Sequence, residues 1–174
     1  DKDRAPNVVD LIQYPARVYP VGRLDKDSEG LLLMTNQGEL ANEIMHAGNF
    51  HEKEYLVTVD QPFNAAFLKK MREGVELKEL GVTTRPCKVE AAGVKTFRII
   101  LTQGLNRQIR RMCAELGYRV ITLKRVRIMN IHLGKLNTGD FRRATPKELE
   151  ELEWQLEQAR LEREEAELLA GQDE

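Results

Sequence analysis

The sequence has few of the residues on which disulfide-stabilised or metal-bound proteins depend. It contains two cysteines, Cys87 and Cys113, whose separation fits neither a disulfide framework nor a zinc site. We expect both to be reduced thiols, as in cytoplasmic proteins. The three histidines lack the spacing of metal ligands, and the run that begins at His51 matches only the first two residues of a zinc-protease helix. The sequence therefore predicts neither a disulfide nor a metal site.

Long apolar runs and a secretory signal are also missing. No apolar stretch approaches the ~20 residues of a membrane span, and the first ten residues lack the apolar centre of a secretory signal. We therefore expect a soluble protein located in the cytoplasm. With 174 residues, 41% of them hydrophobic and 32% charged, the chain has enough apolar residues for one core beneath a charged surface.

The net charge of −1 conceals a segregation of charge along the chain. Residues 146–174 contain eleven acids and three basic residues. Residues 95–127 contain a single acid, Glu115, and nine basic residues: Lys95, Arg98, Arg107, Arg110, Arg111, Arg119, Lys124, Arg125 and Arg127. This asymmetry indicates either a polyanion-binding surface beside an acidic tail or a solvated basic face.

Periodicity in the first third of the chain predicts two strands and a helix between them. Residues 1–20 are expected to be an irregular lead, and a polar loop from Gly22 to Gly30 precedes an apolar run at 31–34 that favours a strand. Residues 53–60 alternate as a strand does. A helix is expected over residues 36–48, capped by Asn36 and ended by Gly48, with one apolar face: Leu40, Ala41, Ile44 and Met45.

The middle of the chain alternates between helical and strand patterns. Asn64 is expected to cap a helix that turns Phe67, Leu68 and Met71 inward. Alternating runs at 87–91 and 97–101 predict two strands. A helix is then expected up to Gly117, because its apolar residues recur at helical spacing: Ile109, Met112, Cys113 and Leu116. A strand rich in arginine is predicted over residues 118–130.

The last element is predicted to be a long helix. Residues 145–148, Thr-Pro-Lys-Glu, form a capping box with proline at the first helical position. After Arg160 the apolar stripe weakens, so the end is expected to be a solvated or frayed helix. The mixture of helices with neighbouring strands predicts an α+β domain with a mixed, mostly antiparallel sheet flanked by helices. We assign residues 1–160 to this domain and residues 161–174 to an acidic helix or tail.

The polar loop from Gly22 to Gly30 is the first candidate for chemistry. Asp25 lies between Arg23 and Lys26, whose positive charges favour the ionised carboxylate, and an ionised aspartate can act as a nucleophile or a base. The alternative is an ordinary aspartate that makes local hydrogen bonds in a glycine-bounded turn. The loop alone does not decide between the two.

Two further groups are candidates for contact with nucleic acid. Tyr55 offers a ring on which a base can stack, or it is an ordinary strand aromatic over the core. Three arginines, Arg107, Arg110 and Arg111, lie at the start or on the polar side of a helix, where they suit phosphate oxygens. The alternative for these three is a solvated helix face.

Taken together, these segments resemble the motifs of the pseudouridine synthases, in the branch that modifies ribosomal RNA at single sites. The catalytic motif of that family is similar to Gly22-Arg23-Leu24-Asp25 and the residues through Asn36. Its second motif resembles Lys53-Glu54-Tyr55, and its third resembles Gly104 to Arg111. The resemblance covers roughly residues 7 to 150, and three motifs in the family's order make a chance match improbable.

The resemblance implies a role for each matching residue. It makes Asp25 the nucleophile, Tyr55 the ring that stacks on the target base and can move a proton, and Arg110 the arginine that pairs with the aspartate and orients it. It places Arg23 near the opened RNA and Leu123 against the base. The remaining residues expected to contact RNA are Lys53, Asn106, Arg107, Gln108, Arg111, Lys124 and Arg125.

The resemblance also implies a function: a specific uridine in ribosomal RNA, expected to be that of the large subunit, is isomerised to pseudouridine without a cofactor. The partner is then an RNA stem-loop, with a transfer RNA loop as a further candidate, and the protein is expected to be a monomer. The alternative is a non-catalytic RNA-binding or ribosome-assembly module. Members of this branch usually begin with a small domain resembling ribosomal protein S4 and a strand with a Lys-Pro-x-Gly motif, so we expect this chain to be a catalytic domain.

Overall fold

A computed structural model of the chain describes residues 17–172, which form two compact units. The first unit contains the described parts of Asp1–Arg23, Leu32–Asn49 and Gly134–Glu174, and the second contains Leu24–Leu31 and Phe50–Leu133. Most of the expected irregular lead lies outside the described residues. No helix in residues 17–172 is long and apolar enough to cross a membrane.

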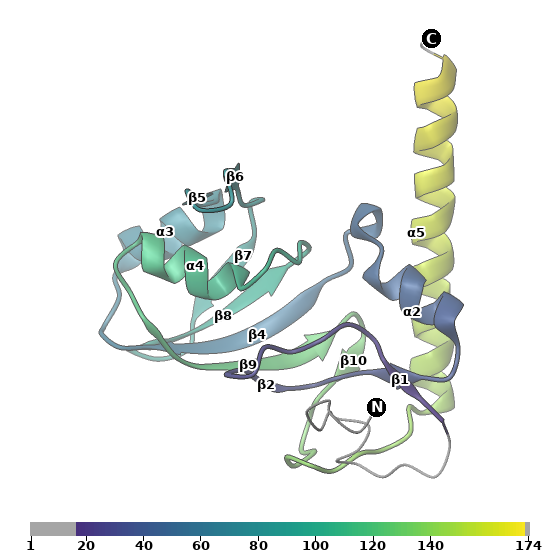
Figure 1. The fold of residues 1–174 in the computed structure, drawn as a ribbon, viewed down its shortest axis with the longest axis horizontal. Helices are drawn as coiled ribbons and strands as arrows, with labels where there is room; N and C mark the ends of the chain where they lie inside the picture. The colour runs from purple at the N-terminus through teal and green to yellow at the C-terminus, as the bar shows by residue number, and fades with distance from the viewer. Residues whose placement is uncertain (1–16, 173–174) are drawn as a thin grey trace, which may run out of the picture. The chain divides into compact units, whose positions relative to one another are not determined.

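A mostly antiparallel sheet forms the framework of the second unit. Its strands follow the order β10-β9-β4-β8-β7 with antiparallel neighbours, and β2 joins β9 in parallel (Figure 1). The expected α+β architecture with a mostly antiparallel sheet is therefore confirmed. The strand bounds are β2 Glu29–Gly30, β4 Lys53–Val59, β7 Lys88–Ala91, β8 Thr96–Leu101, β9 Val120–Ile128 and β10 Ile131–His132.

Two helices, α3 (Ala65–Glu73) and α4 (Gln108–Glu115), cover one face of this sheet. Asn64 caps α3 as expected, because its Oδ1 accepts the Phe67 N–H at 3.0 Å. The apolar stripe of α4 is also confirmed, with Ile109, Met112 and Cys113 at most 4% exposed. The core consists of these stripes and the inward residues of the strands, among them Val57, Val89, Phe97, Ile99 and Leu123. A small hairpin of β5 (Glu76–Leu77) and β6 (Val82–Thr83) lies between α3 and β7 in the chain.

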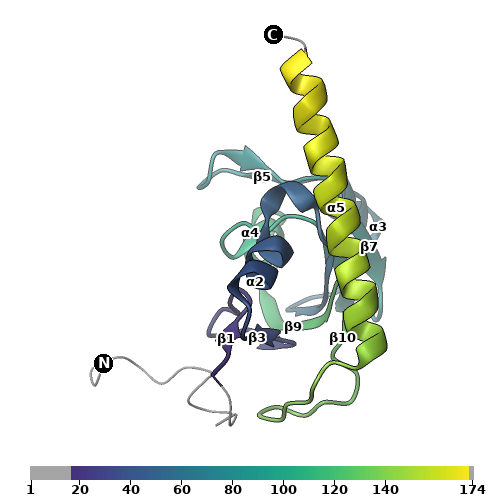
Figure 2. The same ribbon diagram turned by 90° about the vertical axis from the view of Figure 1, so that its right-hand side faces the viewer.

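The first unit is built from a short strand pair and helices. Strands β1 (Tyr19–Pro20) and β3 (Met34–Thr35) pair antiparallel, and helix α2 (Gly38–Met45) leads into the 3-10 turn η1 (Ala47–Asn49). Helix α5 (Pro146–Gln172) runs unbroken beside α2 (Figure 2). The Arg163 guanidinium donates to Asn49 Oδ1 at 2.7 Å and pairs with Glu43 at 3.4 Å. Residues after Arg160 therefore continue the helix, and Arg163 gives this part of it contacts with α2 and η1.

The capping box at the start of α5 is confirmed. Glu148 N–H donates to Thr145 Oγ1 at 3.1 Å, and Thr145 N–H donates to a Glu148 carboxylate oxygen at 2.9 Å. The Arg142 guanidinium, which binds the same carboxylate at 2.7 Å and 2.8 Å, lowers the Glu148 pKa to about 2. The local signal in the sequence was sufficient here because all partners lie within a few residues.

Three expectations for residues 31–48 are wrong in detail. The apolar run at 31–34 is not one strand, because the boundary between the two units falls between Leu31 and Leu32 and only β3 begins at Met34. Asn36 is not the N-cap of α2, because Gln37 occupies that position without a side-chain capping bond and the helix starts one residue later than expected; the Gln37 N–H donates to Thr35 Oγ1 at 3.0 Å. Met45, expected on the apolar face, is 53% exposed, whereas Ile44 is buried.

Both cysteines are free and are held as neutral thiols. Burial raises the pKa of Cys113 to about 12 and that of Cys87 to about 11. Because thiolates and not thiols react, we expect neither cysteine to react with Ellman's reagent at pH 8 in the folded protein, and both to react in guanidinium chloride. Rapid labelling of the native protein would show that one of these side chains leaves the core.

Candidate active site

The loop that carries Asp25 is fastened to the sheet through its last residues. Gly30 of β2 lies beside Arg125 of β9, and Leu31 N–H donates to the Arg125 carbonyl at 2.8 Å. Gly30 has φ +116°, and a Cβ at this position would lie 2.2 Å from the Arg125 carbonyl oxygen. Glycine is required here for two reasons, the backbone conformation and the close approach of β9.

Arg125 completes this attachment with its side chain. Its Nε donates to the Leu31 carbonyl at 2.8 Å. Arg125 therefore accepts the Leu31 N–H with its backbone carbonyl and donates to the Leu31 carbonyl with its side chain. Arg125 is 5% exposed, and its Nη2 has no hydrogen-bond partner. The expected RNA contact of Arg125 is therefore not available in this structure. The side chain instead holds the end of the loop that carries Asp25 against β9.

The start of α4 faces the same loop. Arg107 occupies the N-cap position in the left-handed conformation, with φ 49° and ψ 37°. Gln108, expected to contact RNA, is 4% exposed, and its Oε1 accepts the Leu105 N–H at 3.1 Å. The prediction for Gln108 is therefore corrected: this side chain is used to shape the turn that precedes α4.

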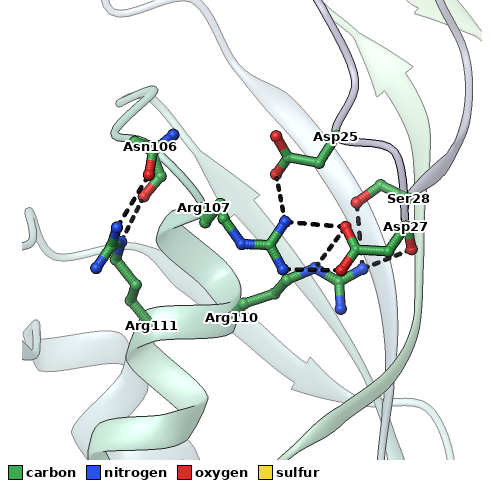
Figure 3. Close-up of polar contacts among 7 residues, drawn as sticks. All are labelled: Asp25, Asp27, Ser28, Asn106, Arg107, Arg110 and Arg111. Carbon is green, nitrogen blue, oxygen red and sulfur yellow. Dashed lines mark hydrogen bonds and ion pairs between the residues drawn. The ribbon is translucent and has the colours of Figure 1, made fainter.

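Arg107 lies between two aspartates (Figure 3). Its Nη1 and Nη2 donate to Asp27 Oδ1 and Oδ2 at 2.9 Å and 2.8 Å, a bidentate pair. The same Nη1 lies 3.7 Å from Asp25 Oδ2, an ionic contact longer than a hydrogen bond. The Asp25 side chain is 28% exposed, so its carboxylate is reachable from solvent while it contacts a fixed cation.

Arg110 binds the segment after Asp25 rather than Asp25 itself. Its Nη2 donates to the Asp27 carbonyl at 2.6 Å and to Ser28 Oγ at 3.3 Å, and its Nε lies 3.5 Å from Asp27 Oδ1. The expected pairing of Arg110 with Asp25 is therefore corrected, and Arg107 is the arginine that contacts Asp25. Asp27, an acid two residues after Asp25 in the same glycine-bounded loop, was a possible partner for these arginines, and the sequence interpretation did not consider it.

The arginines determine the charge state of Asp27. The hydrogen-bonded Arg107 guanidinium lowers the Asp27 pKa from 3.8 to about 2. Because the folded-state pKa is the lower one, the stabilising contribution of this pair is complete above about pH 4 and is lost as the pH falls through about 2. Asp27 is therefore ionised at neutral pH.

Four of the expected site residues lie on the neighbouring strands β4 and β9. Tyr55 of β4 lies opposite Arg125 of β9 and is partly buried against the core. Lys53 lies two residues before it, on the same side of the strand. Burial, and secondarily the Arg125 charge, lowers the Lys53 pKa. Leu123 is 7% exposed and belongs to the core, and its contact with the target base stays a prediction.

The remaining residues expected to contact RNA are Asn106, Arg111, Lys124 and Arg23. Arg111 donates to the Asn106 carbonyl at 2.9 Å and to Asn106 Oδ1 at 3.0 Å, away from Asp25 in Figure 3, and also pairs with Glu79. Lys124 is exposed on β9. Arg23 is exposed at the end of its segment of the first unit.

The basic segment is largely paired with acids. Five of its nine basic residues form ion pairs with carboxylates: Arg98, Arg107, Arg110, Arg111 and Arg127. On β4, Glu54 binds both Arg98 and Arg127, at 3.4 Å and 3.2 Å. Residues 95–127 therefore do not form a surface of unpaired cations. Counting charges in the sequence overestimated the positive charge that is free of carboxylates.

Metal ligation has no support in the described part of the chain. Residues 17–172 contain no group of three or more histidine, cysteine, aspartate or glutamate side chains arranged to hold a metal ion. The chemistry available at Asp25 is that of a carboxylate contacted by a guanidinium: nucleophilic attack, or transfer of a proton.

Comparison with known proteins identifies the family. A solved crystal structure of a pseudouridylate synthase superposes with a TM-score of 0.80 and 31% identity, covering 84% of this chain and 65% of the other. The dual-specificity RNA pseudouridine synthase RluF of Escherichia coli (strain K12) is 52% identical over 146 residues, which are 84% of this chain and 50% of RluF. The resemblance of the sequence motifs to those of the pseudouridine synthases is thereby confirmed.

A second curated relative is more distant. The ribosomal large subunit pseudouridine synthase B of Bacillus subtilis (strain 168) is 38% identical over 144 residues, which are 79% of this chain and 58% of the relative. The chain thus spans about half the length of the curated relatives that it matches. The model of the RNA pseudouridylate synthase family matches residues 2–115, a range that includes Asp25, Tyr55 and Arg110. The chain therefore belongs to the RNA pseudouridylate synthase family.

Proposed function

We propose that this chain isomerises a uridine of large-subunit ribosomal RNA to pseudouridine, with Asp25 as the nucleophile. The observation that supports this most is the Asp25 carboxylate, 28% exposed and contacted at 3.7 Å by Arg107, within the segment that the family model matches. A protein that only binds RNA gains nothing from a carboxylate so placed, because phosphates repel it.

The reaction requires four changes at the target nucleotide and no cofactor. The bond between N1 of uracil and C1′ of the ribose breaks, the base turns, and a bond between C5 and C1′ forms. The hydrogen on C5 then leaves as a proton, while N1 gains one. Attack by the Asp25 carboxylate, on the sugar or on the base, holds one fragment covalently while the base turns. The bond to the carboxylate oxygen breaks again as C5 joins C1′ or, after attack on the base, as the product is released, so Asp25 is regenerated. Atoms and electrons balance because the product is an isomer of the substrate.

Access to that bond requires the nucleotide to leave its stack, at a cost of a few kcal/mol. Tyr55 is the aromatic residue proposed to receive the extruded base, since stacking on an aromatic ring contributes roughly 1–3 kcal/mol per base. Its position on β4, opposite Arg125, places it on the strand next to the one that anchors the Asp25 loop. Tyr55 is also proposed to move a proton during the reaction.

RNA contact is proposed for the cations that remain exposed, among them Lys124, and for Arg111 when a phosphate competes with Glu79 for its guanidinium. Lys124→Gln is expected to lower the slope of log binding constant against log salt concentration by about one, since one phosphate contact is lost. Lys69→Gln, which removes the same charge from α3, is the matched control and is expected to leave the slope unchanged. If the slope for Lys124→Gln equals that of the wild-type chain, Lys124 does not contact an RNA phosphate.

Tritium release tests the proposed function. The chain is incubated with fragments of large-subunit ribosomal RNA that carry tritium at uridine C5, and the RNA is then digested to identify pseudouridine. Release of tritium with formation of pseudouridine is expected. RNA binding without release would reject the enzyme and favour the alternative, a non-catalytic RNA-binding or assembly module. A transfer RNA transcript in the same assay determines whether a second class of RNA is accepted.

A further inference from the structure

Asp27 is the most strongly engaged carboxylate of the site, yet the proposed reaction gives it no task. It receives both arms of the Arg107 guanidinium at 2.9 Å and 2.8 Å, and Arg110 Nε lies 3.5 Å from it. Half of its side chain is exposed, so burial does not force this arrangement. Two arginines therefore converge on an exposed acid that lies two residues from the proposed nucleophile.

The bidentate pair fixes where the Arg107 guanidinium lies. Arg107 has an unfavourable left-handed backbone at the N-cap and makes no side-chain capping bond, so nothing in its own helix holds its side chain. A guanidinium that donates from two nitrogens to two carboxylate oxygens has its plane and its direction set. Because Nη1 is shared between Asp27 Oδ1 and Asp25 Oδ2, fixing Arg107 on Asp27 also places its charge at Asp25.

The backbone of the same turn is fixed independently. Ser28 N–H donates to the Asp25 carbonyl at 2.9 Å, which closes a turn over residues 25–28. Arg110 donates to the Asp27 carbonyl at 2.6 Å and to Ser28 Oγ at 3.3 Å. Asp27 is thus held by its backbone and presents its carboxylate to Arg107. These bonds suit a positioning role, because the backbone of Asp27 is held by contacts other than those to Arg107.

We propose that Asp27 is a positioning residue that holds Arg107 against the carboxylate of Asp25, and so orients the proposed nucleophile. The inference rests on the proposed function for its catalytic consequence, but the hold on Arg107 is a property of the folded chain. In the alternative interpretation Asp27 is a place-holder: its carboxylate occupies a site between two arginines that an RNA phosphate takes when RNA binds. The contact of Arg107 with Asp25 favours positioning, since a place-holder requires no second acid.

Three variants test this proposal: Asp27→Asn, Asp27→Glu and, as the charge-matched control, Glu90→Gln, which neutralises an exposed acid on β7. For Asp27→Asn we expect kcat for tritium release to fall roughly 10–100-fold, the size of effect that misplaced reacting groups produce. KM is expected to stay within about threefold, as for Glu90→Gln. Asp27→Glu, which retains the carboxylate, is expected to recover part of the lost kcat.

A second measurement does not depend on turnover. Relaxation of the arginine Nε–H groups, measured by 15N NMR on the free protein, reports how rigidly each guanidinium is held. Arg107 is expected to become mobile in Asp27→Asn and to remain ordered in Glu90→Gln, while Arg110 stays ordered through its bonds to the Asp27 carbonyl and Ser28. An ordered Arg107 in Asp27→Asn overturns the proposal, even if the wild-type chain proves to have no synthase activity.

The remaining outcomes also decide the question. A mobile Arg107 with unchanged kcat rejects positioning. Tighter RNA binding than Glu90→Gln, again with unchanged kcat, supports the place-holder instead. Absence of tritium release from the wild-type chain rejects the proposed function, and the catalytic part of this inference with it, whereas the relaxation measurement still determines whether Asp27 holds Arg107.

Discussion

Asp25→Asn is expected to abolish tritium release from uridine-labelled RNA, with a loss on the order of 10⁴-fold or more, as when a nucleophile is removed from other enzymes. Asparagine has nearly the same shape, so it fits the loop, but its amide cannot attack as a carboxylate does. Arg107 retains its bidentate bond to Asp27 in this variant, so the cation of the site stays in place.

RNA binding separates this loss from unfolding. The contact that Asp25 makes with Arg107 is a partly exposed ion pair at 3.7 Å, and pairs of this kind contribute at most about 1 kcal/mol. We therefore expect the melting temperature to change by only a few degrees and RNA affinity to be equal or slightly higher, since one negative charge is removed. Retained turnover in Asp25→Asn would assign the chemistry to another group, and a large loss of RNA binding would make Asp25 a structural residue.

Much of the fold followed from local signals in the sequence. Asn64 was predicted to cap α3, and the bond from Phe67 N–H to its side chain confirms it. The capping box at Thr145 and the buried stripe of α4 were predicted for the same reason, since each depends on residues three or four positions apart. Patterns that span three or four residues predict local structure well because they do not depend on a distant partner.

Pairings between distant segments were not predictable in this way. Strand β2 pairs with β9 over only two residues, Glu29 and Gly30, with partners 95 positions later, Lys124 and Arg125. Two residues carry no alternation that a pattern can detect. The apolar run at 31–34 was read as one strand because its composition favours one, but the chain passes from one unit to the other within it.

The candidate site shows the same limit. The resemblance placed Asp25, Tyr55 and the arginines in their motifs, and sequence spacing could not tell which arginine meets which acid. Arg107 contacts Asp25 because the left-handed turn at the N-cap of α4 directs it to the loop, while Arg110, one helical turn later, binds the Asp27 carbonyl. Gln108 and Arg125 have polar side chains but are buried, because each forms a hydrogen bond with a backbone group of a neighbouring loop.

Gly30→Ala is expected to separate the catalytic loop from the sheet and to reduce tritium release at least about 100-fold. The added Cβ would lie 2.2 Å from the Arg125 carbonyl oxygen and 2.5 Å from the Arg125 nitrogen, contacts that no side-chain rotation relieves because both atoms are backbone. The β2–β9 pairing must therefore break. Strain at φ +116° adds a further cost on the order of 1–3 kcal/mol.

Gly81→Ala is the matched control for that substitution. Gly81 also has a positive φ, +65°, but a Cβ there would meet no atom within 4 Å, so it carries the conformational cost without the collision. We expect Gly81→Ala to lower the free energy of unfolding by about 1–2 kcal/mol and to leave turnover unchanged. Hydrogen exchange gives the second readout, because the Leu31 amide, bonded to Arg125, should lose protection in Gly30→Ala alone. Wild-type turnover with a protected Leu31 amide in Gly30→Ala would mean that the β2–β9 pairing accommodates the added Cβ, whereas wild-type turnover with an unprotected Leu31 amide would mean that the loop which carries Asp25 does not depend on this pairing.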